Sequence, residues 1–161
     1  MIVVSDTTPI SSLYRIGHLY LLHDLFERVI LPSAVMSELL QLKKWGYDLQ
    51  EISLSSWIEV KTVSNQEYLS QLNHILDAGE AEAIALAKEL HAELLLTDEM
   101  KGRAIAKKEG LQIVGTLGIL LSSKNFGLIP KIQQPLDALI HEANFRISDS
   151  LYKEILNRAG E

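Results

Sequence analysis

The chain contains no cysteine, and its 161 residues include only 9 glycines, 4 prolines and 6% aromatic residues. The absence of cysteine excludes disulfide bonds and cysteine nucleophiles, and it fits a reducing, cytoplasmic setting. With few glycines and prolines and 47% hydrophobic residues, the sequence is neither collagen-like nor largely disordered. The low aromatic content argues against an extensive base-stacking surface. The length predicts one compact domain.

Long apolar runs are also missing. The longest, such as Leu117–Leu121, falls far short of the roughly 20 residues that cross a bilayer, and residues 1–6 lack the pattern of a secretory signal. We therefore expect a cytoplasmic protein without a membrane partner.

Basic charge is not in excess, because 15 lysines and arginines stand against 21 acidic residues, for a net charge of -6. This balance argues against a protein that coats nucleic acid nonspecifically. An enzyme that gathers carboxylates around a divalent metal remains compatible with it. The sequence also lacks a Gly-x-Ser-x-Gly elbow, a Gly-x-Gly-x-x-Gly fingerprint and a P-loop. These absences argue against a serine hydrolase, a dinucleotide-binding protein and a P-loop enzyme.

Short apolar runs alternate with segments of helical periodicity. The expected strands lie at residues 1–5, 29–31, 57–60, 93–97 and 111–114. This order predicts an α/β fold whose central sheet is mostly parallel and flanked by helices on both faces. The segment from 129 to 161 is predicted to be helical without a strand. We expect one domain over residues 1–125 and a helical C-terminal extension over residues 126–161 that packs on it.

Two helix starts carry specific signals. Thr8 is expected to cap the first helix, with Pro9 at its first position. Gly79 is expected to interrupt a helical segment, so that a new helix begins at Glu80.

The acidic residues form a pattern that composition alone does not predict. Asp6 and Asp98 each follow a predicted strand, so both should lie at the same edge of a parallel sheet. Glu38 and Glu80 lie early in predicted helices and could converge on that edge. The alternative is that each aspartate caps a helix and each glutamate is solvated.

Four converging carboxylates would repel one another unless a cation were present. Mg²⁺ and Mn²⁺ prefer oxygen ligands, and the five histidines show no metal-ligand spacing. The pattern therefore favours Mg²⁺ or Mn²⁺ over Zn²⁺.

Several segments resemble one known family. Residues 4–10 (Val-Ser-Asp-Thr-Thr-Pro-Ile) are similar to the opening motif of PIN-domain ribonucleases, and residues 76–87 resemble their third acidic motif. Residues 95–99, with Arg103 and the Val-Gly-Thr-Leu-Gly run at 114–118, resemble an uncharacterised branch of PIN-like proteins related to VapC-type toxins. The resemblance covers residues 1–123.

The resemblance implies a three-layer PIN-like fold and a Mg²⁺- or Mn²⁺-dependent endoribonuclease, with the toxin of a toxin–antitoxin pair as one form of that function. It implies that catalysis and metal binding belong to Asp6, Glu38, Glu80 and Asp98. Secondary candidates are Asp77 and Glu82 for the third acid, Glu99 as a ligand or base, and Thr7 and Ser5 for orienting water. Hydrolysis would use a water activated by the metal.

The expected partners are RNA, a small antitoxin-like protein and a second copy of the chain in a homodimer. Lys101 and Arg103 are the substrate-binding candidates, and further basic residues lie at Lys107, Lys108, Lys43 and Lys44. The alternative for these clusters is a solvated helix face.

Two other functions compete with the nuclease. Asp6 could be the nucleophile of a haloacid-dehalogenase-like phosphoryl-transfer enzyme, but such enzymes usually carry a second acid two positions on, where this chain has Thr8. The other alternative is a catalytically idle PIN-like module that binds a protein.

Overall fold

The fold is built on a small sheet at the centre of the chain. The computed structural model describes residues 1–161. Its strands are β1 (Val3–Ser5), β2 (Val29–Pro32), β3 (Ile58–Lys61), β4 (Leu94–Leu96) and β5 (Ile113–Val114). The strand order is β3-β2-β1-β4-β5, and every neighbouring pair is parallel. The predicted α/β fold with a parallel central sheet is therefore confirmed.

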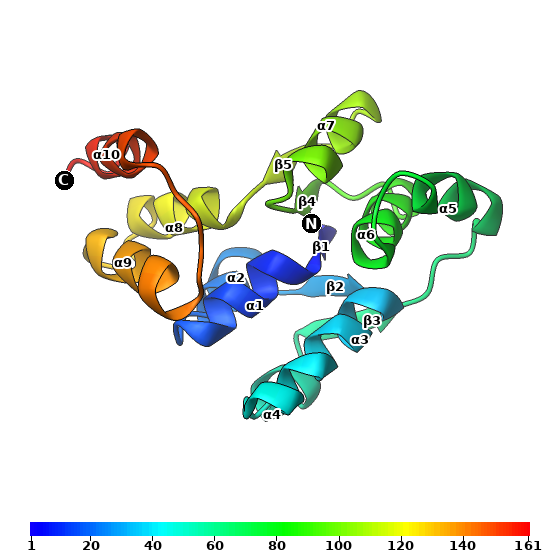
Figure 1. The fold of residues 1–161 in the computed structure, drawn as a ribbon, viewed down its shortest axis with the longest axis horizontal. Helices are drawn as coiled ribbons and strands as arrows, with labels where there is room; N and C mark the ends of the chain where they lie inside the picture. Colours follow the sequence, from blue (N-terminus) through cyan, green and yellow to red (C-terminus); the bar gives the residue numbers. More distant parts are fainter.

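Helices connect the strands and form the C-terminal part of the chain (Figure 1). They are α1 (Thr7–Arg15), α2 (Tyr20–Phe26), α3 (Ser33–Leu40), α4 (Gln50–Ser53), α5 (Gln66–Asn73), α6 (Ala78–Glu89), α7 (Met100–Lys108), α8 (Thr116–Asn125), α9 (Gln133–Glu142) and α10 (Asp149–Arg158). A 3-10 helix, η1 (Gln41–Trp45), follows α3. None of these helices has the length and apolar character needed to span a membrane.

Successive strand residues point to opposite faces of the sheet, and each face has its own core. Val3 and Leu96 belong to a cluster of 23 buried residues that also takes in α1, α2, α8 and α9. Val4 and Leu95 belong to a second cluster of 14 buried residues, contributed mainly by α5 and α6. In Figure 1, α5 and α6 lie on one side of β1, and α8 and α9 lie on the other. The three layers explain why the central strands are apolar at consecutive positions.

The C-terminal helices belong to the first of these cores. Leu136 and Leu139 of α9 and Ile155 of α10 are buried within it. The Glu161 carboxylate accepts hydrogen bonds from the Ile132 amide at 2.7 Å and from the Lys124 ammonium at 2.7 Å. These contacts hold the end of α10 against α8 and the start of α9.

Two helices begin earlier than the sequence indicates. Asp6, not Thr8, caps α1, because its carboxylate accepts a hydrogen bond from the Thr7 amide at 2.7 Å. Asp77 caps α6 by accepting one from the Glu80 amide at 2.9 Å. Gly79 therefore lies inside the first turn of α6 instead of interrupting it. A strong acidic cap outweighs the low helix propensity of glycine.

The strand order creates a crevice beside β1. The chain winds from β1 through β2 to β3 on one side and continues through β4 to β5 on the other. Ligands bind to α/β sheets at such a reversal, outside the carboxyl ends of the strands. Ser5 pairs with Leu96, and the Asp6 amide donates to the Leu96 carbonyl at 2.9 Å. The residues that follow β1 and β4 therefore lie side by side.

Candidate active site

Asp6 lies one residue beyond the central strand, at the edge where the strand order reverses. The residue is only 3% exposed. One carboxylate oxygen accepts from the Thr7 amide, and the other accepts from the Thr97 hydroxyl at 3.4 Å. Burial raises the pKa of Asp6 to about 7, and the charges of Glu80, Asp77 and Glu38 push it in the same direction against the Thr7 hydrogen bond. Asp6 is therefore a carboxyl group that titrates near neutrality.

Glu38 reaches the crevice from α3. Its carboxylate accepts a hydrogen bond from the Thr7 hydroxyl and another from the Gly79 amide at 3.1 Å. A Cβ atom at position 79 would lie 2.6 Å from one of the Glu38 carboxylate oxygens, so a larger residue would displace this carboxylate. The position of the Glu38 carboxylate thus depends on the residue that the sequence marked as a helix interruption.

Glu80 enters the crevice from the first turn of α6. It is 8% exposed, and its Cδ would lie 3.8 Å from a Cβ at Gly102 of α7. Burial raises the pKa of Glu80, and the charges of Asp77, Glu99 and Glu38 raise it further. We call Asp6, Glu38 and Glu80 the acidic cluster. The sequence predicts that these three residues converge with Asp98. In the structure, the charges of Glu80 and Glu38 raise the pKa of Asp6, and the charge of Glu38 raises the pKa of Glu80.

Asp98 is hydrogen-bonded to the start of α8. Its two carboxylate oxygens accept hydrogen bonds from the Thr116 amide at 2.8 Å and the Thr116 hydroxyl at 2.6 Å. Burial raises the pKa of Asp98, while Thr116 and the positive charge of Arg103 lower it. Thr116 begins α8, so the Asp98 carboxylate acts as a cap that the N-cap residue Gly115 cannot provide.

Glu99 follows β4 and acts on the acidic cluster through its charge. It is exposed, it is the N-cap residue of α7, and its charge raises the pKa of Glu80. The sequence placed it second to Asp98. The structure brings Glu99 toward the crevice and ties Asp98 to α8.

The remaining acidic candidates have structural partners. Asp77 is an exposed N-cap of α6, although its charge acts on Asp6 and Glu80. Glu82 accepts a hydrogen bond from the Ala34 amide at 3.1 Å, in the first turn of α3. Since Glu38 of α3 accepts from Gly79 of α6, each of these two helices carries a carboxylate to the start of the other.

Of the predicted basic residues, Arg103 forms a hydrogen bond with the segment that follows β4. Its guanidinium donates to the Thr97 carbonyl at 3.0 Å. Lys101 is exposed on α7. The other four lysines are exposed at the end of α7 and on η1, namely Lys107, Lys108, Lys43 and Lys44.

Sequence reasoning assigned no role to Thr97 or Thr116. Both are buried, and their hydroxyls bind Asp6 and Asp98, respectively. Thr97 could have been identified from its position, since it directly follows β4 in the register that places it beside Asp6. Thr116 lies 18 residues from Asp98, and no local pattern connects the two.

The acidic cluster has the donor chemistry of a hard divalent cation. No lysine, arginine or histidine forms a salt bridge with any of its three carboxylates. Uncompensated carboxylates in a buried setting favour oxygen-preferring cations such as Mg²⁺ and Mn²⁺. No three acidic or histidine side chains of the structure are arranged to hold a metal ion together. The case for a divalent cation at the acidic cluster therefore rests on the chemistry of its oxygen donors and on their negative charge.

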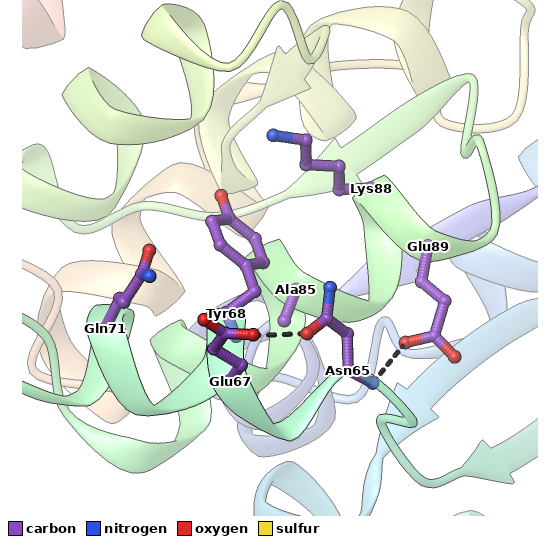
Figure 2. Close-up of a pocket in the computed structure, with 7 residues that line it drawn as sticks. All are labelled: Asn65, Glu67, Tyr68, Gln71, Ala85, Lys88 and Glu89. Atoms are coloured by element: carbon purple, nitrogen blue, oxygen red, sulfur yellow. Dashed lines mark hydrogen bonds between the residues drawn. The ribbon is translucent and has the colours of Figure 1, made fainter.

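A separate pocket of about 370 Å³ lies between α5 and α6 (Figure 2). It is lined from α6 by Ala85, Lys88 and Glu89, and the Lys88 ammonium lies 4.7 Å from the centre of the Tyr68 ring. None of the acidic cluster lines this pocket. It is therefore distinct from the crevice at the start of α6.

Comparison with known proteins matches the chain to one family. The family model "DUF3368: PIN domain" matches residues 2–161. Among solved structures, the chain is similar to a PilT N-terminus domain protein, SSO1118, from the hyperthermophilic archaeon Sulfolobus solfataricus P2. That match has 21% identity and a TM-score of 0.49, and it covers 76% of this chain and 93% of the other. No curated protein sequence matches the chain.

The family match extends over nearly the whole chain, including the C-terminal helices. It agrees with the α/β fold and its parallel five-stranded sheet. PIN domains are typically metal-dependent nucleases, and they often bind Mg²⁺. The chain belongs to the PIN domain family.

Proposed function

We propose that this protein is an endoribonuclease that hydrolyses RNA phosphodiester bonds with Mg²⁺ or Mn²⁺. The observation that carries the proposal is the acidic cluster at the carboxyl edge of the sheet, in which Asp6 and Glu80 are buried and no carboxylate forms a salt bridge with a basic side chain. Family membership supports a nuclease as the class of enzyme. The choice of RNA rests on the resemblance of residues 4–10 and 76–87 to PIN-domain ribonucleases.

Asp6, Glu38 and Glu80 would hold the metal, and Glu99 is the best-supported fourth carboxylate because its charge reaches Glu80. Asp98 remains a predicted ligand, but both of its oxygens already accept hydrogen bonds from Thr116. When bound, the metal would lower the pKa of a water molecule and offset charge on the phosphate. Thr7 holds Glu38 in place, and Thr97 holds Asp6.

The test is cleavage of a labelled RNA pool by purified protein with Mn²⁺, with EDTA and with the Asp6→Asn variant. We expect cleavage only by the wild type and only with metal. Equal cleavage by Asp6→Asn, or cleavage that persists in EDTA, would attribute the activity to a contaminating nuclease. Calorimetric titration of Mn²⁺ checks metal binding independently, and an unchanged affinity in Asp6→Asn would refute the proposed site.

A second candidate is a protein-binding role, either alone or as the toxin of a toxin–antitoxin pair. The specific observation is that Trp45 and Leu54 are 78% and 77% exposed on the segment that follows α3. A small antitoxin-like protein and a homodimer remain the proposed partners. Size-exclusion chromatography with light scattering tests the homodimer. A wild-type protein that is a monomer would argue against self-association. A dimer that persists in Trp45→Ser would argue against self-association through this segment.

A further inference from the structure

A groove beside the acidic cluster collects most of the arginines of the chain. The cavity has a volume of about 570 Å³ and lies between α7, β5, α8 and α10. The chain has five arginines, and three of them, Arg103, Arg146 and Arg158, line this groove. We call this surface the arginine groove. Such a concentration is unexpected in a protein with a net charge of -6.

None of the three guanidinium groups forms a salt bridge, whereas Arg28 pairs with Glu59, and Lys88 and Lys124 pair with Glu109 and Glu161. Asp98 is the acidic residue that lines the groove, and Arg103 is near enough to lower its pKa. Three arginines against one aspartate still leave the lining with a positive charge that an anionic ligand can neutralise.

Apolar side chains form much of the lining of the groove. Val114, Leu117 and Leu121 come from β5 and α8, and Leu151 and Ile155 come from α10. On α10, positions 151, 155 and 158 fall on one face of the helix, so Arg158 stands at the end of this apolar strip. A lining of arginines and apolar side chains suits a single-stranded nucleic acid. Guanidinium groups bind phosphate by two hydrogen bonds and also stack on bases.

Helix α7 joins the groove to the acidic cluster. Gly102 faces Glu80 and Thr97, and the next residue, Arg103, lines the groove. Arg103 donates to the Thr97 carbonyl, and the Thr97 hydroxyl donates to Asp6. Arg103 thus connects the lining of the groove, through Thr97, to Asp6.

We propose that the arginine groove binds the backbone of single-stranded RNA next to the bond that is cut, with Arg146 and Arg158 as phosphate-binding residues. The inference rests on the proposed nuclease function for its ligand, but it concerns binding and not hydrolysis. It assigns a substrate-binding role to the helical segment after residue 125, which supplies both arginines.

The test measures binding of a fluorescein-labelled single-stranded RNA of arbitrary sequence by anisotropy, in EDTA so that no cleavage occurs, over a range of KCl concentrations. We expect the double variant R146Q/R158Q to bind at least about tenfold more weakly at low salt. Each lost phosphate contact should also reduce the slope of log affinity against log salt by about 0.7, so the slope should fall by about 1.4. The matched control is Lys153→Gln, because Lys153 is exposed on α10 but does not line the groove.

Binding that is unchanged in R146Q/R158Q, or equally weakened in Lys153→Gln, would overturn the proposal. So would wild-type protein that does not bind RNA, in which case a protein ligand for the groove becomes the better explanation. Cleavage assays separate this inference from the proposed function. If the wild type cleaves RNA and R146Q/R158Q has the same KM, the groove is wrong and the nuclease stands. If binding changes as expected but no metal supports cleavage, the groove stands and the nuclease fails.

Discussion

Asp6 and Asp98 have the same sequence context and opposite surroundings. Each is the acidic residue that closely follows a buried parallel strand, and both have a pKa raised by burial. Around Asp6, the nearby charges are other carboxylates. Around Asp98, the neighbours are two hydrogen-bond donors of Thr116 and the positive charge of Arg103.

The difference shows that a position at the carboxyl edge of a sheet does not decide the role of an acidic residue. The sheet register brings the backbone of both segments to the same crevice. Each aspartate has a hydrogen-bond donor at both oxygens, so the charges nearby make the difference. Asp6 is surrounded by other negative charges, which favour a cation, whereas Arg103 partly offsets the charge of Asp98.

The largest expected effect is on catalysis. Asp6→Asn removes charge from the centre of the acidic cluster, and we expect metal-dependent cleavage to fall by more than about 100-fold. Asp98→Asn keeps an acceptor for Thr116, so its loss should stay within about tenfold. Initial rates with Mn²⁺ measure both. If Asp98→Asn is as inactive as Asp6→Asn while its fold is intact, Asp98 is a ligand and the contrast between the two aspartates is wrong.

The second largest expected effect is on the pH dependence of stability, which reflects the surroundings of Asp6. Because the folded-state pKa of Asp6 is about 7 and its ordinary value is 3.8, the folded protein holds the proton more tightly than the unfolded chain. Stability without metal should therefore fall as pH rises, by about 2 kcal/mol from this group between pH 5.5 and 8.5, and then level off.

Urea denaturation in EDTA measures this trend. Asp6→Asn should be less sensitive to pH over the same range and more stable than the wild type at pH 8.5. A wild-type stability that rises with pH over this range would contradict the raised pKa of Asp6.

The third effect concerns Asp98 and folding. Asp98→Ala leaves the buried amide and hydroxyl of Thr116 without their acceptor, and we expect a loss of about 1–3 kcal/mol. Asp98→Asn should lose less because its amide oxygen still accepts from Thr116. Denaturation of both variants in EDTA checks the difference. Equal stability of Asp98→Ala and the wild type would show that the Thr116 contacts do not support α8.

The smallest expected effect tests a carboxylate outside the crevice. Glu82→Ala removes the acceptor of the Ala34 amide, which should cost about 1 kcal/mol, as loss of a helix cap does. Glu82→Gln keeps an acceptor and serves as the control. Both variants should bind Mn²⁺ as the wild type does. A loss of Mn²⁺ affinity in Glu82→Gln would instead make Glu82 a metal ligand.

The sequence predicted the sheet and part of the site because both follow from local patterns. Apolar runs identified the strands, and the position directly after the first strand identified Asp6. The partners of Asp98 could not be predicted, because Thr116 is distant in sequence and its contact depends on how β5 leads into α8. The start of α6 was misplaced because glycine alone suggested a break, whereas Asp77 supplies the cap. The boundary at residue 125 stays a prediction.

The reciprocal hydrogen bonds between α3 and α6 affect how the acidic cluster is lost in local unfolding. Glu38 accepts from the first turn of α6, and Glu82 accepts from the first turn of α3. Separation of the two helices breaks both bonds in one event and carries Glu38 and Glu80 away from Asp6. Such cooperative local unfolding would expose the amides of Ala34 and Gly79 to hydrogen exchange together. The acidic cluster would then be dispersed in one step.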